Sequence, residues 1–77
     1  MENQEEIRKS IQKVVLAMAK EPNNTENYHE LAKYYAIQED YDKVISIYET
    51  LLSIDPEDEQ AILNTGSIYY FQKEYFE

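Results

Sequence analysis

The fold of this 77-residue chain is decided by residues 24–56, which read NTENYHELAKYYAIQEDYDKVISIYETLLSIDP. Apolar side chains recur in this stretch at helical spacing, first around Leu31 and Tyr35 and then around Val44 and Tyr48. Only the short turn at residues 39–40 separates the two groups. Two apolar stripes joined by so short a turn predict two antiparallel helices in contact.

The same pattern continues on both sides of this stretch, with a period of about 34 residues. So many matches in one register are hard to explain by chance and indicate an internal repeat. The matched pairs are Tyr28/Ile62, Ala32/Gly66, Tyr35/Tyr69, Gln38/Gln72, Tyr41/Tyr75, Ile45/Ile11, Tyr48/Val14, Leu51/Ala17 and Pro56/Pro22. The weakest match sets Thr65 against Leu31, where an apolar contact is lost. The period predicts stacked helical hairpins.

Within residues 24–56 the order of side-chain types resembles a tetratricopeptide (TPR) repeat. The matching positions are Tyr28, Leu31, Ala32, Tyr35, Val44, Tyr48 and Pro56. The departures are Tyr for Trp, Ala for Gly, Val for Ala, and Leu51 where the family usually has a small residue. Each replaces one apolar residue by another. The resemblance implies an all-α, TPR-like helical-hairpin solenoid that acts in protein–protein interaction as a scaffold or adaptor.

Four antiparallel helices are expected in one domain spanning residues 1–77. In TPR terms, residues 4–20 form the second helix (B) of a partial repeat, 25–58 a full repeat with helices A and B, and 59–77 the first helix (A) of a truncated repeat. The last of these helices is expected to end near Gln72, with a turn at residues 73–77. Asn3, Asn24 and Asp58 are suitable N-caps. Gly66 inside the last helix costs about 1 kcal/mol relative to Ala and would let a neighbouring helix approach closely.

Composition narrows the classes of function. The net charge is −9, from 16 acidic and 7 basic residues, which disfavours nucleic acid and anionic membranes as partners. The chain has no cysteine, so disulfides and thiolate zinc sites are excluded. No apolar run approaches the ~20 residues that span a bilayer, and the acidic N-terminus carries no visible signal peptide. We therefore expect a cytoplasmic protein.

Catalysis is not expected. The sole histidine, His29, has no second His or Cys with which to bind a metal, and no Gly-rich loop is present to cradle a phosphate. The acidic groups around residues 39–40 and 57–59 fall at turns and helix starts, where capping explains them. We predict no enzyme activity, no metal and no cofactor.

The resemblance implies a concave groove, lined by A helices, that takes a peptide or helix from a partner protein. Candidate groove residues are His29, Lys33, Ile37, Asn64, Ser67, Tyr70 and Phe71. His29 and Lys33 form either a solvated wall or a small cationic spot for an acidic or C-terminal group. Tyr70 and Phe71 are either aromatic anchors for the ligand or packing for a missing or borrowed helix. Some TPR proteins hold the C-terminal carboxylate of their ligand with Lys and Asn side chains on successive A helices. Of those positions only Asn64 matches in this chain, so a carboxylate-binding site of that kind is not predicted.

Both ends of the predicted array carry apolar residues that have no partner within the chain, although terminal repeats normally present a polar outer face. The candidates for self-association are Val14, Ala17, Ile62, Tyr69, Phe71 and Tyr75. Three interpretations stay open: an excerpt of a longer repeat array, self-association through the end helices, and a stable monomer. The alternative function is accordingly a self-assembly element that dimerises or oligomerises by pairing its terminal helices.

Overall fold

The computed structural model describes residues 3–76, with side chains described as far as Lys73. It contains four helices: α1 (Gln4–Lys20), α2 (Thr25–Ile37), α3 (Tyr41–Ile54) and α4 (Glu59–Phe76). No strand occurs in residues 3–76, so the predicted all-α class is confirmed. The predicted helix starts agree with the structure, because each was read from a capping residue or a turn.

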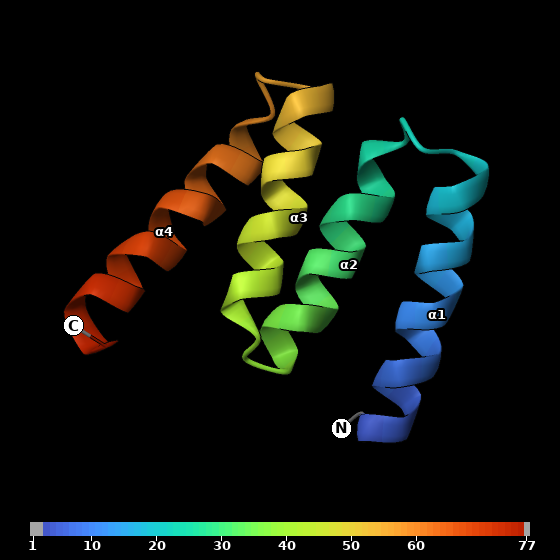
Figure 1. Ribbon diagram of the computed structural model, residues 1–77, viewed down its shortest axis with the longest axis horizontal. Coiled ribbons are helices and arrows are strands. Elements are labelled where there is room, and N and C mark those ends of the chain that lie inside the picture. The colour runs from blue at the N-terminus through green and yellow to red at the C-terminus, as the bar shows by residue number, and fades with distance from the viewer. Residues whose placement is uncertain (1–2, 77) are drawn as a thin grey trace.

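The helices lie side by side in chain order, with α1 and α4 at opposite ends of the row (Figure 1). α2 packs against both α1 and α3, and α3 packs against α4. The molecule measures 36 × 32 × 16 Å, so the row is only about one helix layer thick. α4 leans away from α3 toward its C-terminal end (Figure 1). This arrangement leaves one long side of α1 and one of α4 without a neighbouring helix.

The three predicted N-caps are confirmed. A side-chain oxygen of each accepts a hydrogen bond from a backbone N–H that would otherwise be free at the helix start. The donors are the N–H of Glu6 to Asn3 (2.8 Å), of Glu26 to Asn24 (3.1 Å) and of Ala61 to Asp58 (3.0 Å). Asp40, at the N-cap position of α3, makes no such bond.

The turn between α2 and α3 closes α2 with a Schellman motif. The N–H of Asp40 donates to the carbonyl of Tyr35 (3.0 Å) and the N–H of Glu39 to that of Ala36 (2.9 Å). Glu39 has a φ of 59°, a left-handed conformation that glycine more often adopts. The motif reverses the chain within three residues and sets α3 antiparallel to α2.

The core lies between α2, α3 and the start of α4. Its buried members are Tyr28, Ala32, Val44, Tyr48, Leu51 and Ala61. Of the apolar side chains expected to face inward on α2 and α3, those of Tyr28, Leu31, Val44, Ile45, Tyr48 and Leu51 are buried. Tyr35 is only half-buried and packs at the edge of this core. Most positions that the pattern selects within residues 24–56 therefore lie in the core.

Two expectations for the end helices are wrong. The turn expected at residues 73–77 is absent as far as the structure describes the chain, because α4 continues to Phe76 without a Gly or Pro to stop it. Val14, expected on the open side of the first helix, is only 6% exposed. It lies on the apolar stripe of α1, the helix that packs against α2.

Candidate functional site

A groove of about 540 Å³ lies between α2 and α4, with α3 at its base. The lining from α2 is His29, Glu30, Ala32, Lys33 and Ala36; from α3, Val44 and Tyr48; and from α4, Gln60, Asn64, Ser67 and Ile68. The base is therefore apolar and the rims are polar. Its size is in the range of ligand-binding clefts in proteins.

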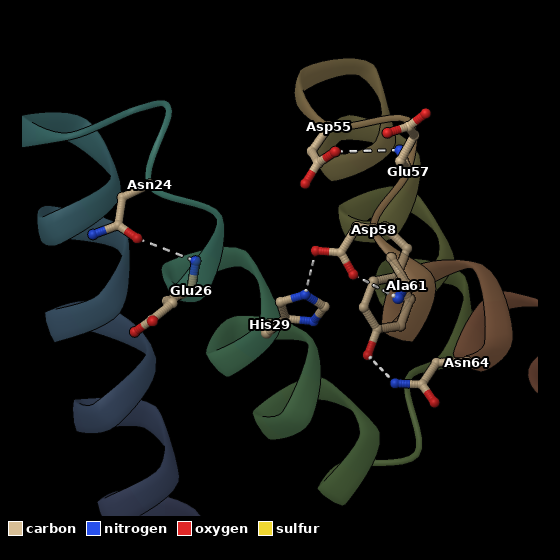
Figure 2. A network of polar contacts seen from close by, with 9 residues as sticks. Asn24, Glu26, His29, Asp55, Glu57, Asp58, Ala61 and Asn64 are labelled. Atoms are coloured by element: carbon tan, nitrogen blue, oxygen red, sulfur yellow. Dashed lines mark hydrogen bonds and ion pairs between the residues drawn. The ribbon is translucent and has the colours of Figure 1, made fainter.

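The two walls of the groove are joined at one end by His29 of α2 and Asp58, the residue that precedes α4. His29 Nε2 lies 2.9 Å from Asp58 Oδ2, while Asp58 Oδ1 accepts the N–H of Ala61 (Figure 2). One carboxylate thus caps α4 and also holds it to α2. Because an ionised carboxylate only accepts hydrogen bonds, His29 Nε2 is the donor and carries the proton.

The environment of Asp58 favours its charged form. The hydrogen bond from the Ala61 N–H is the main reason that the pKa of Asp58 lies below its ordinary value of 3.8, and the bond from His29 lowers this pKa further. His29 Nδ1 is buried and has no hydrogen-bond partner, and the imidazole ring lies against Tyr48 with ring centroids 5.9 Å apart. His29 therefore connects α2 to the start of α4 through Asp58.

A second bond ties the base of the groove to its far wall. Asn64 Nδ2 of α4 donates to the hydroxyl of Tyr48 of α3 at 3.0 Å. This bond uses the Nδ2 donor of Asn64 and a lone pair of the Tyr48 hydroxyl, so the two side chains hold each other in place.

Of the seven predicted groove residues, the structure brings four together: His29, Lys33, Asn64 and Ser67 all line the groove. Ile37, Tyr70 and Phe71 do not line it. The ring of Phe71 instead lies 5.7 Å from that of Tyr41, centroid to centroid, at the wide end between α3 and α4. Ile37 and Tyr70 are exposed outside the groove. The lining also includes Tyr48, which the repeat pattern places in the core, and Ile68, which the pattern does not select.

The predicted self-association residues are scattered more widely. Ile62 and Tyr69 are exposed on α4, Ala17 is half-buried on α1, and Val14 is buried. Tyr75 lies beyond the residues whose side chains the structure describes. The large apolar residues exposed on α1 are Val15 and Leu16, which the repeat register does not select.

Replacing Asp58 by Ala is expected to lower the free energy of unfolding by about 1–2 kcal/mol, because the cap of α4 and the partner of His29 are lost together. Since the folded pKa of Asp58 lies below 3.8, this stabilisation is fully present above pH 3.8 and is lost as the pH falls through the folded value. Urea unfolding followed by circular dichroism, at neutral pH and well below pH 3.8, measures both effects.

The matched control is Asp40→Ala, at the helix start where the carboxylate makes no capping bond. We expect it to change the unfolding free energy by only a few tenths of a kcal/mol. Equal losses from Asp58→Ala and Asp40→Ala would contradict the bridge, as would a gap between wild type and Asp58→Ala that does not narrow in acid.

Within residues 3–73, no group of three or more His, Cys, Asp or Glu side chains is arranged to hold a metal ion. Among the described helices, none is both long and apolar enough to cross a membrane.

Comparison with known proteins does not assign the chain to a family. No protein-family model matches the sequence, and no curated protein matches it. The functional interpretation therefore depends on the residues and contacts described above.

Proposed function

We propose that this chain is a TPR-like interaction module that binds a segment of a partner protein in the groove between α2 and α4, without catalysis. The observation that carries the proposal is the groove, with an apolar base from α3 and polar rims on two separate helices. A bound peptide or helix would bury an apolar side chain on that base and leave its backbone at the rims.

The residues on the rims of the groove suggest which chemical groups a bound partner segment would carry. His29 is engaged by Asp58, so Lys33 is the cation that remains available at the groove. Its side chain is exposed, with Nζ 5.4 Å from the centre of the Tyr34 ring. We expect the ligand to place an acidic side chain or a C-terminal carboxylate at Lys33 and an apolar side chain beside Ala36 and Ile68.

Selection from a displayed library of random peptides with free C-termini tests this function. Peptides that bind the chain are expected to lose affinity about tenfold when Lys33 is replaced by Glu, because attraction to the carboxylate becomes repulsion. Ser67→Trp should abolish binding by filling the groove. Both side chains are exposed, so neither change should alter the folded helices. Titration calorimetry of selected peptides against each variant measures the affinities.

The matched control is Lys73→Glu, which reverses an exposed charge on α4 outside the groove lining. We expect this variant to bind the selected peptides with unchanged affinity. Failure to select any peptide, or selected peptides that bind all variants equally, would contradict the proposed function.

A further inference from the structure

The outer side of α4 carries an apolar surface whose central position has no side chain, because it is a glycine. Ile62, Leu63, Tyr69 and Tyr70 are all exposed, and Gly66 lies among them along the helix. We call these five residues the α4 surface. A Cβ built at Gly66 meets no atom within 4 Å, so no side chain of the described chain requires a glycine there. The residue nonetheless costs about 1 kcal/mol of helix stability relative to Ala.

The equivalent position one repeat earlier shows what a small residue does in this fold. Ala32 of α2 is fully buried, in one cluster with Val44 and Tyr48 of α3. Gly66 occupies the same register on α4, but no helix covers it. A small residue flanked by exposed apolar side chains is suited to a helix that approaches closely.

The outer side of α1 carries the opposite charge to the rest of the chain. α1 contains four of the seven basic residues and only two of the sixteen acidic ones. Lys9, Lys13, Leu16 and Lys20 follow each other at helical spacing, so they share one face. That face is opposite the buried Ile7 and Val14, and Leu16 on it is 65% exposed. We call these four residues the α1 stripe.

The α1 stripe and the outermost row of α4 have the same spacing. Positions 9, 13, 16 and 20 are separated by four, three and four residues, and so are positions 59, 63, 66 and 70. If the two helices ran parallel with Leu16 over Gly66, Lys9 would lie next to Glu59. Each of these two residues is seven residues before the crossing point, about 10.5 Å along its own helix axis. The same alignment brings Lys20 to the ring of Tyr70, where a cation–π contact is favourable.

We propose that the α4 surface binds the α1 stripe of a second copy of this chain. Leu16 fills the gap at Gly66, Lys9 lies against Glu59, and Lys20 lies against the ring of Tyr70. The two surfaces differ, so the contact is head-to-tail and leaves one free surface at each end of a pair. Such an assembly grows with concentration, and it weakens with salt because ion pairs contribute. The groove residues of α4 take no part in it.

Complementary variants test this contact. Leu16→Glu destroys the α1 stripe and leaves the α4 surface intact, whereas Gly66→Gln obstructs the α4 surface and leaves the α1 stripe intact. Sedimentation velocity from micromolar to millimolar concentration is expected to show wild-type chains growing beyond the 9.2 kDa monomer. Each variant alone should stay monomeric. An equimolar mixture should form a dimer and nothing larger, because one working pair of surfaces remains.

Controls keep a folding defect apart from a lost contact. Both substitutions fall at exposed positions, so circular dichroism melting of each variant should match the wild-type monomer within the small effect of helix propensity. Gly66→Ala should raise the melting temperature in the monomer. Wild-type chains that stay monomeric at every concentration would overturn the proposal. So would variants that still assemble, or a mixture that fails to form the dimer.

Discussion

Replacing Tyr48 by Ala is expected to lower the free energy of unfolding by about 3–5 kcal/mol, the largest effect of any change considered. Tyr48 is 6% exposed and lies in the core shared by α2, α3 and α4. It also forms part of the base of the groove and accepts the hydrogen bond from Asn64. A chain of 77 residues has a total stability of only about 4–12 kcal/mol, so much of the population would unfold.

Two further variants separate the sources of that loss. Tyr48→Phe keeps the ring and removes only the hydroxyl that Asn64 binds, so we expect a loss of about 1 kcal/mol. Tyr69→Ala changes a tyrosine that is 51% exposed and should cost well under half as much as Tyr48→Ala. Urea unfolding curves give all three values. A Tyr48→Ala variant as stable as Tyr69→Ala would refute the core as described.

Leu51→Ala is expected to lower the free energy of unfolding by about 2–5 kcal/mol. Leu51 is fully buried in the cluster that includes Tyr28 and Ala61, so truncation leaves a cavity where three helices meet. The change removes no hydrogen bond, so it isolates the contribution of apolar packing. The same urea experiment measures it, with the slope against denaturant showing whether the unfolding remains a single transition.

Leu63→Ala is the matched control, because it makes the identical chemical change on a leucine that is 68% exposed. We expect the monomer to lose less than about 0.5 kcal/mol. If Leu63→Ala destabilised the monomer as much as Leu51→Ala, α4 would have to be packed differently from the arrangement described.

The sequence was most informative where local chemistry determines structure. Asn3, Asn24 and Asp58 predict helix starts because their side chains satisfy free N–H groups within the same turn. Within residues 24–56, apolar residues spaced three or four apart predict the core, because that spacing places them on one face of a helix. The assignment to the TPR family stays a prediction, since a row of four helices is compatible with it and does not identify it.

The rest depended on contacts between residues far apart in the chain. The sequence leaves His29 as either part of a solvated wall or part of a cationic spot, and nothing in its own helix indicates that Asp58 lies 2.9 Å away. The sequence held one indication of this contact: capping uses only one carboxylate oxygen of Asp58 and leaves the other free to accept a hydrogen bond. Val14 was expected to lie exposed on the first helix. It is buried because α1 packs its apolar stripe against α2, and one neighbouring helix is enough to cover that stripe. For Gly66 the sequence predicts a close helix contact, and only the coordinates reveal that no atom of the described chain lies within 4 Å of a Cβ built there.

The order of the helices in space has a consequence for how the chain acquires its structure. Each helix packs on the one that follows it in sequence, so only the short segments 21–24, 38–40 and 55–58 must close to bring partners together. Short closures carry a small entropic penalty, and proteins rich in such neighbouring contacts fold within microseconds to milliseconds. The α2–α3 hairpin can therefore form before α4 is in place, which allows folding to begin while the chain is still being synthesised.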